Sequence, residues 1–334
     1  MKRVRIALFG YGAVAKAFHQ ILASDRDRLR SIHGIDPSVV AIVRSSGAWI
    51  DPAGLAPGAD VLARRKPGAA ADLAASVACD LVVDLTPTNL ATGGVGLEIT
   101  RRALGRGIPV VTANKGPLVV AYRELTELAR AKGVPFLFEG SVAGAIPTLN
   151  LHDRCLPGNR VTRVDGILNG TSNFILTRMA EEGLGFEPAL DEARELGYAE
   201  ADPSADVDGH DAAAKVVILA NHVLGRNLHL GDVATTGIRS VSGAAMRLAR
   251  ERGYAIRLVA SVGLDGPAEV APKLVPRSSE LNVNGTLNVV RYTTEHAGAF
   301  TLVGKGAGGR ETATAVLSDV IQATSPRGAA GKAT

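Results

Sequence analysis

The sequence predicts an α/β protein with two domains: a Rossmann-type nucleotide-binding domain, and an α+β domain in which helices cover an open sheet. Three observations support this fold class. A strand-like run, residues 4–9, leads through a glycine-rich turn into a run with helical periodicity. Short apolar runs and helical stretches then alternate, as expected of a parallel sheet. In the second half, helical runs precede a series of strand-like runs, which is typical of a sheet covered on one face.

The individual elements follow from the same periodicities. After the first strand, the first domain has strand-like runs at residues 39–43, 81–85 and 109–112, with a helix at 94–104. The second domain has helical runs at 172–180, 188–196 and 212–224, then strand-like runs at 256–262, 270–275 and 289–292. The predicted domains are 1–145 and 146–308, followed by a helix, 309–324, that returns to the first domain, and a flexible tail, 325–334.

Composition and charge exclude several classes of protein. The formal net charge is +4, yet no run of five basic residues occurs, so nucleic-acid binding is not expected. Cys79 and Cys155 have neither the number nor the spacing of a disulfide framework or a zinc site. The N-terminus lacks an export signal, and no apolar run reaches the roughly 18 residues of a membrane span. The expected compartment is a reducing cytoplasm.

The turn after the first strand has the G-x-G-x-x-A form of a dinucleotide-binding fingerprint, made of Gly10, Tyr11, Gly12, Ala13, Val14 and Ala15. Gly10 permits the tight turn, Gly12 lets the backbone approach a pyrophosphate, and Ala15 lets the helix pack closely on the sheet. The phosphates would lie at the helix N-terminus, where free N–H groups favour an anion. A glycine turn used only for packing is the alternative.

The end of the second strand bears on the choice of nicotinamide cofactor. Arg44, Ser45 and Ser46 stand where an enzyme that selects NAD usually has an acidic residue. A guanidinium and hydroxyls can instead bind a 2′-phosphate, and residues 64–66, Arg-Arg-Lys, could add positive charge. We therefore expect NADP, with NAD as a second possibility. The alternatives are a solvated Arg44, and Asp36 as a turn residue rather than the missing acid.

Two polar clusters follow the next strands, at residues 86–89 and 112–117. They lie at the carboxyl ends of parallel strands, where ligands bind in open α/β sheets. Lys115 is the notable residue, because the positive charge of a neighbouring nicotinamide would lower the pKa of its amine. A solvent-exposed loop lysine is the alternative.

An acidic residue and a lysine stand four apart in the second domain. Asp211 and Lys215 fall at the start of a helical run and therefore project from one face. Glu200 lies on the loop before them and could close over the same place. Acidic groups that bind a substrate amine and a lysine that moves a proton suit the reduction of a small amino-acid carbonyl compound. An ordinary surface ion pair is the alternative.

Taken together, these motifs resemble those of the homoserine dehydrogenase family. The resemblance extends from residue 6 to about residue 321 and rests on several blocks in the same order. These blocks are residues 10–15, 112–115, 138–147, 166–173, 200–215 and 304–309, the last followed by Thr312 and Ala313.

The resemblance implies a reversible, nicotinamide-dependent reduction of L-aspartate 4-semialdehyde to L-homoserine, in the biosynthesis of threonine, methionine and isoleucine. It implies that Glu200 and Asp211 bind the substrate and that Lys215 donates the proton to the carbonyl oxygen. Lys115 would be a second essential lysine, beside the nicotinamide. Crowding of two lysines and an oxidised nicotinamide favours proton loss, whereas Asp211 opposes it, and the sequence does not decide between them.

Further features come from the resemblance alone. It implies that Thr86 and Gly306 contact the cofactor, and that the second sheet joins a partner subunit in a homodimer. It also implies a sodium ion bound largely by backbone carbonyls of Glu139, Val142, Gly144 and Ile146, a donor set suited to a hard cation.

The sequence also departs from many family members. It ends soon after Gly309, without the regulatory domain or fused kinase of other members, so threonine feedback through such a domain is not expected. Strong binding of a 2′-phosphate by Arg44 could slow release and make NADP an inhibitor while NAD turns over. Two other readings stay open: a related dehydrogenase for another small amino-acid semialdehyde or amino alcohol, and a non-catalytic nicotinamide-binding sensor.

Overall fold

The computed structural model describes residues 1–58 and 70–324. The chain divides into two compact units. The first unit contains Met1–Ser141 and the residues from Gly308 onward, and the second is the continuous segment Val142–Ala307. The predicted tail, 325–334, and the basic residues 64–66 lie outside the described residues.

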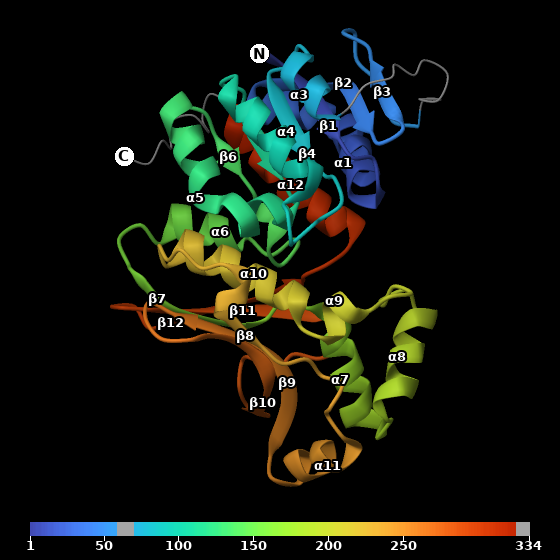
Figure 1. Ribbon diagram of the computed structural model, residues 1–334, viewed down its shortest axis with the longest axis vertical. Helices are drawn as coiled ribbons and strands as arrows, with labels where there is room; N and C mark the ends of the chain where they lie inside the picture. Colours follow the sequence, from blue (N-terminus) through green and yellow to red (C-terminus); the bar gives the residue numbers. More distant parts are fainter. Residues whose placement is uncertain (59–69, 325–334) are drawn as a thin grey trace. The chain divides into compact units, whose positions relative to one another are not determined.

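Each unit contains one six-stranded sheet (Figure 1). The strands of the first sheet are β1 (Lys2–Phe9), β2 (Ile35–Arg44), β3 (Gly47–Ile50), β4 (Leu81–Asp84), β5 (Val110–Thr112) and β6 (Phe136–Leu137). The strands of the second sheet are β7 (Val161–Ile167), β8 (Val233–Thr235), β9 (Tyr254–Gly263), β10 (Ala268–Pro276), β11 (Leu287–Thr294) and β12 (Ala299–Lys305).

The helices of the first unit are α1 (Ala13–Ser24), α2 (Arg26–His33), α3 (Ala70–Ser76), α4 (Gly94–Gly105), α5 (Lys115–Lys132), the 3₁₀ turn η1 (Glu139–Ser141) and α12 (Gly309–Thr324). Those of the second unit are α6 (Thr148–Asn150), the π-helical turn η2 (Leu151–Cys155), α7 (Gly170–Glu182), α8 (Phe186–Glu195), α9 (Ser204–Val207), α10 (His210–Val223), the 3₁₀ turn η3 (Leu230–Asp232) and α11 (Gly243–Glu251). No helix within the described residues is both long and apolar enough to cross a membrane.

The first sheet has the strand order β3-β2-β1-β4-β5-β6. β1 pairs in parallel with β2 and β4, and β5 pairs in parallel with β4 and β6. The parallel part matches the predicted Rossmann-type fold. The sequence did not predict β3, which pairs antiparallel with β2 across a short turn at Arg44–Gly47. A hairpin strand of four residues is too short to show a period of its own.

The core of the first unit lies on both faces of its sheet. Alternate residues of β1 face opposite sides, with Val4, Ile6 and Leu8 in one cluster and Ala7 and Phe9 in another. The first cluster includes α1 and α12, which come from opposite ends of the chain and pack against each other (Figure 1). The second cluster includes α3, α4 and α5.

Asp36 lies within β2, near its first residue, and not in a turn as the sequence suggested. Its carboxylate accepts hydrogen bonds from Arg26 and Arg30 of α2, at N–O distances of 2.9 Å for each closest pair. Hydrogen bonds from Arg30 and then Arg26 lower the pKa of Asp36 to about 2. Asp36 is therefore a structural anchor for α2 at the amino end of the strand.

We expect Asp36→Asn to lower the free energy of unfolding at pH 7 by about 1 kcal/mol, a value discounted because both arginines are partly exposed. The folded-state pKa of Asp36 is depressed, so its contribution is present above the unfolded pKa of 3.8 and is lost as the pH falls towards 2. Urea unfolding of both proteins across this range tests the prediction. A stability difference that stayed constant from pH 7 to pH 2 would contradict it.

The second sheet has the order β12-β11-β7-β9-β10-β8 and is antiparallel except where β8 pairs with β10. On one face, Tyr292 of β11 is fully buried and its hydroxyl donates to the Thr148 carbonyl of α6, at 3.0 Å. This is the predicted open sheet with helical cover. β7, β8 and β12 were not predicted as strands; β8 and β12 are the two edges of the sheet, and β7 lies in its interior between β11 and β9.

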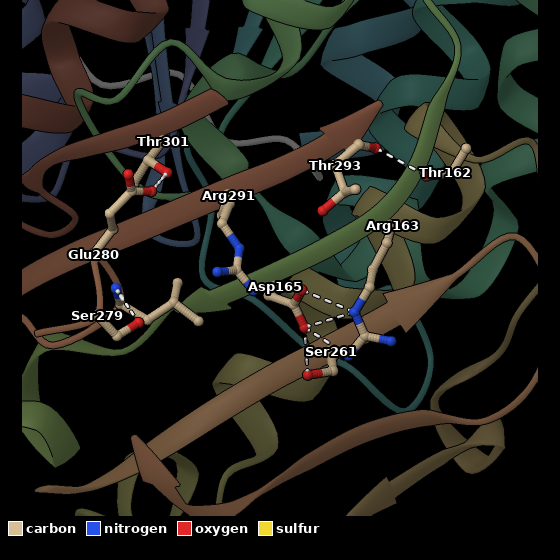
Figure 2. Close-up of polar contacts among 10 residues, drawn as sticks. Thr162, Arg163, Asp165, Ser261, Ser279, Glu280, Arg291, Thr293 and Thr301 are labelled. Atoms are coloured by element: carbon tan, nitrogen blue, oxygen red, sulfur yellow. Dashed lines mark hydrogen bonds and ion pairs between the residues drawn. The ribbon is translucent and has the colours of Figure 1, made fainter. Parts of the chain in front are cut away.

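The opposite face of this sheet carries a polar cluster (Figure 2). Asp165 of β7 stands opposite Arg291 of β11 and Ser261 of β9 in the strand register. Its carboxylate accepts hydrogen bonds from Arg163 and Ser261 and pairs with Arg291 at 3.3 Å. Burial alone would raise the pKa of Asp165, but the hydrogen bonds from Arg163 and Ser261 outweigh it and hold the pKa below its usual value.

Candidate functional site

The fingerprint turn has the geometry that its glycines predict. Gly10 has a φ of +84°, and a Cβ placed on it would overlap the carbonyl oxygen of Leu85, so only glycine fits. Gly12 caps the N-terminus of α1, and a Cβ on it would meet nothing within 4 Å. Ala15 is fully buried in the core. The turn therefore leaves open space beside the helix N-terminus, where a diphosphate can approach the backbone.

The remaining fingerprint residues support the turn. The Tyr11 hydroxyl lies 3.0 Å from Nδ1 of His19, whose Nε2 lies 2.9 Å from the carbonyl oxygen of Leu55. Burial lowers the pKa of His19. Ala13 lies against Gly309 at the start of α12, and Val14, the second residue of α1, packs against the core. His19 was not singled out from the sequence, because a single histidine in a helical run carries no pattern.

Arg44 is the last residue of β2 and is exposed. It is at the carboxyl end of the strand, the end at which an adenine ribose binds in this kind of fold. Asp36 is near the other end of the same strand, and its carboxylate forms ion pairs with Arg26 and Arg30. No acidic residue within β2 is therefore placed to bind the ribose hydroxyls.

A buried hydrogen-bond network joins the carboxyl ends of β4 and β5. Asp84 is fully buried and accepts hydrogen bonds from the Thr86 hydroxyl at 2.6 Å and from the Thr112 hydroxyl at 3.2 Å. The Asn114 amide donates to the Thr86 hydroxyl oxygen at 3.0 Å. Burial raises the pKa of Asp84, and these hydrogen bonds oppose the rise.

The same network fixes the start of α5. Asn114 is the N-cap, and its side-chain oxygen accepts from the Gly116 backbone N–H at 2.9 Å. Lys115 is the first residue of the helix and is half-buried. The sequence identified Thr86 and Lys115 but missed Asp84 and Asn114. An aspartate at the end of an apolar strand, followed by polar residues at the next strand end, was the available signal.

The second polar centre is on α10 and the loop before α7. Lys215 is buried, with 7% of its surface exposed. Its Nζ donates to Oδ2 of Asp211 at 2.7 Å and to the carbonyl oxygen of Leu168 at 2.6 Å. An ammonium has three N–H donors, so within residues 1–58 and 70–324 one of them remains for a further acceptor. The burial of this pair contradicts the alternative of an ordinary surface ion pair.

Asn169 and Asp206 complete this centre, and neither was among the predicted site residues. The Asn169 amide donates to Asp211 at 3.0 Å and to Asp206 at 2.6 Å, while its oxygen caps α7 by accepting from the Ser172 N–H. Burial raises the pKa of Asp206 and the charge of Asp211 raises it further, against a hydrogen bond from Asn169. Asn169 thus holds two carboxyl groups beside one lysine.

Glu200 and Lys115 are the other residues that the sequence predicted to act on the substrate. Glu200 is exposed on the loop between α8 and α9, and among the described residues no hydrogen bond or ion pair joins it to Lys215. Lys115 belongs to the first unit and Lys215 to the second. The proposed role of Glu200 in binding substrate therefore stays a prediction.

The segment predicted to hold sodium has an unusual backbone. Ala143 and Gly144 both have positive φ, +54° and +56°. A Cβ on Gly144 would lie 2.7 Å from the Gly306 carbonyl oxygen, so the two segments are in close contact. The Ile146 carbonyl already accepts a hydrogen bond from the Thr148 N–H at 2.8 Å. Val142, Gly144 and Ile146 belong to the second unit and Glu139 to the first.

Known protein families match almost the whole chain. A family model described as homoserine dehydrogenase matches residues 147–321, and one described as homoserine dehydrogenase, NAD binding domain, matches residues 10–139. The homoserine dehydrogenase of Methanocaldococcus jannaschii is 44% identical over 95% of this chain and 97% of its own length. The NAD(+)-dependent homoserine dehydrogenase of Pseudomonas canavaninivorans is 38% identical, over 96% of each protein.

Solved structures agree with these relatives. A crystal structure from Archaeoglobus fulgidus has a TM-score of 0.90 and 37% identity, covering 96% of this chain and 99% of that one. A hyperthermophilic archaeal homoserine dehydrogenase in complex with NADPH has a TM-score of 0.83 and 31% identity, covering 96% and 97%. Both the sequence matches and the structural matches extend across the two units.

Proposed function

The chain belongs to the homoserine dehydrogenase family, and on that premise we propose how its residues perform the reaction. It is an NAD(P)-dependent homoserine dehydrogenase, an oxidoreductase that interconverts L-aspartate 4-semialdehyde and L-homoserine. The observation that carries the catalytic proposal is the buried Lys215, held by two acceptors with a third donor position remaining.

When bound, the nicotinamide supplies a hydride to the aldehyde carbon or accepts one from the alcohol. Lys215 donates a proton from Nζ to the developing alkoxide in reduction and accepts the hydroxyl proton in oxidation. Asp211 and the Leu168 carbonyl fix the position of Nζ, and Asn169 fixes Asp211. We propose that Asp211 and Glu200 also bind the substrate, with Glu200 at its α-amino group.

Lys115 is proposed as the second essential lysine. The N-cap at Asn114 and the network around Asp84 set its position at the first residue of α5. A cation there would contact the substrate beside the nicotinamide. Thr86 and Gly306 are proposed to contact the cofactor, as are the fingerprint residues.

An assay of homoserine oxidation by the purified protein, with NAD and NADP in parallel, tests the activity. We expect turnover with at least one of them. Cofactor binding without turnover would point to another semialdehyde or amino alcohol as the substrate, or to a sensor.

The proposed sodium site at residues 139–146 is tested in the same assay by exchanging sodium for potassium. Unchanged rates would count against the site.

We propose that NADP is the preferred cofactor, because Arg44 is exposed at the carboxyl end of β2 and no other residue at that end of the strand is acidic. Arg44→Ala should weaken NADP binding by about 10- to 100-fold, the value of a charge-assisted hydrogen bond, and should change NAD binding little. Arg130→Ala, which removes an exposed arginine from the last turn of α5, is the matched control. Equal loss for both cofactors would contradict the proposal.

The same variant tests whether NADP is released slowly. If Arg44 binds the 2′-phosphate so tightly that NADP inhibits, Arg44→Ala should convert NADP from an inhibitor into a substrate. Product-release rates for the two proteins, measured by stopped-flow fluorescence, distinguish this outcome from simple loss of affinity.

We further propose a homodimer formed through the face of the second sheet that carries Asp165 and Arg291 (Figure 2). Val303 of β12, in register with Val289 on this face, is 52% exposed, as expected of an apolar residue that a second subunit would cover. Light scattering at micromolar concentration should give twice the monomer mass. Val303→Asp should shift the protein towards the monomer.

We also propose a cytoplasmic location, consistent with two free cysteines.

A further inference from the structure

Two histidines and an aspartate meet in the second unit, outside the proposed catalytic centre. His152 and Asp153 come from the π-helical turn η2, and His222 comes from the last turn of α10. Nδ1 of His152 lies 2.8 Å from Oδ1 of Asp153, and Nε2 of His222 lies 2.9 Å from the same oxygen. One ligand atom from each residue falls within 4.8 Å of the others.

The three side chains come from two segments that are distant in the sequence. His152 and Asp153 are consecutive residues of the π-helical turn η2, and both lie beside His222, which is 69 residues further along the chain from Asp153. Single π-helical turns occur often at functional sites.

We propose that His152, Asp153 and His222 form a binding site for a divalent first-row transition-metal ion, represented by Zn²⁺. Two imidazole nitrogens and a carboxylate oxygen are a donor set that suits Zn²⁺, Co²⁺ and Ni²⁺, whereas Mg²⁺ and Ca²⁺ prefer oxygen alone. Three protein ligands leave a fourth position for water.

Binding of the metal ion requires only small movements of the three side chains. Tetrahedral Zn²⁺ has bonds of about 2.0–2.1 Å to nitrogen and oxygen, which places its ligand atoms roughly 3.4 Å apart. The donor pairs at 2.8 Å and 2.9 Å must separate slightly to admit the ion, by rotation of partly exposed side chains. Each neutral imidazole keeps its single N–H on the nitrogen that does not bind the metal.

Metal binding would join two segments near the catalytic helix. The site connects η2 to the end of α10, the helix that carries Asp211 and Lys215. His222 is seven residues beyond Lys215, about two helical turns. The bound ion would therefore stabilise α10 and raise the temperature at which the protein unfolds.

The test uses the full-length protein without a histidine tag, treated with chelator and then titrated with Zn²⁺ by calorimetry. We expect saturable binding of one ion per chain and a higher unfolding temperature with Zn²⁺. His222→Gln should weaken binding at least about tenfold and abolish the thermal shift. His296→Gln, at a histidine whose side chain is 74% exposed, is the matched control and should behave as the wild type.

Absence of saturable binding by the wild type, or equal affinity in His222→Gln, would overturn the proposal. Circular dichroism confirms that the variant folds. If His222→Gln does not fold, Asp153→Asn removes the anionic ligand with less change of shape. Substitution with Co²⁺ gives a separate measure, because a tetrahedral site produces strong visible absorption and an octahedral surface site produces weak absorption.

Discussion

Lys215→Ala is expected to reduce the rate of homoserine oxidation by about 10²- to 10⁴-fold, the usual contribution of a positioned general acid or base. Lys215 is buried, and its Nζ is held by Asp211 and the Leu168 carbonyl. Alanine removes the ammonium group that donates a hydrogen bond to Asp211. Because the fingerprint turn belongs to the other unit, cofactor affinity should change little.

Steady-state kinetics and a separate titration of cofactor binding check this expectation. Lys215→Arg is an informative companion, since it keeps a positive charge beside Asp211 while its guanidinium does not release a proton at neutral pH. It should fold and remain inactive. Lys273→Ala, which removes a partly exposed lysine of β10 that pairs with Glu269, is the matched control. Activity of Lys215→Ala near that of the control would refute the proton-transfer role.

Substitution of the fingerprint glycines should separate folding from cofactor binding. Gly10→Ala should lower the free energy of unfolding by more than about 2 kcal/mol, because the residue has a φ of +84° and its Cβ would overlap the Leu85 carbonyl. Gly12→Ala should leave stability within about 0.5 kcal/mol. It should still weaken NAD(P) binding about tenfold or more, because its methyl group occupies the space beside the helix N-terminus.

Gly105→Ala is the control for both variants. Gly105 ends α4, and a Cβ on it would meet nothing within 4 Å, so neither stability nor cofactor affinity should fall. Chemical denaturation and calorimetric titration with NADPH measure the two effects independently. Normal cofactor affinity in Gly12→Ala would mean that the diphosphate does not lie against this turn.

The elements that the sequence predicted well are those that depend on neighbouring residues. The helix expected at 212–224 is α10, His210–Val223, and the helix expected at 309–324 is α12, Gly309–Thr324. The fingerprint also depends on local spacing. β3 and β12 were missed because an edge strand is defined by the strand it pairs with, and that partner is not visible in a short apolar run.

The candidate sites show the same difference between contacts within one segment and contacts between distant segments. Asp211 and Lys215 could be paired from their spacing, because residues four apart share a helix face. Asn169 meets Asp206 across 37 residues of sequence, and Asp84 meets Thr112 across 28. His152, Asp153 and His222 come together only through a π-helical turn and a distant helix. No spacing rule on one segment predicts such contacts, since the fold itself creates them.

The division of the chain has a consequence for its synthesis on the ribosome. α12 contributes Ala313, Val316 and Val320 to the core of the first unit, yet it emerges after the whole of Val142–Ala307. Folding of the first unit therefore stays incomplete, with part of its apolar core unfilled, until the inserted unit and then α12 have been translated. A release-point assay on arrested chains should find that the dinucleotide-binding half becomes protease-resistant only after α12 leaves the exit tunnel, so the earlier-made half is the later to mature.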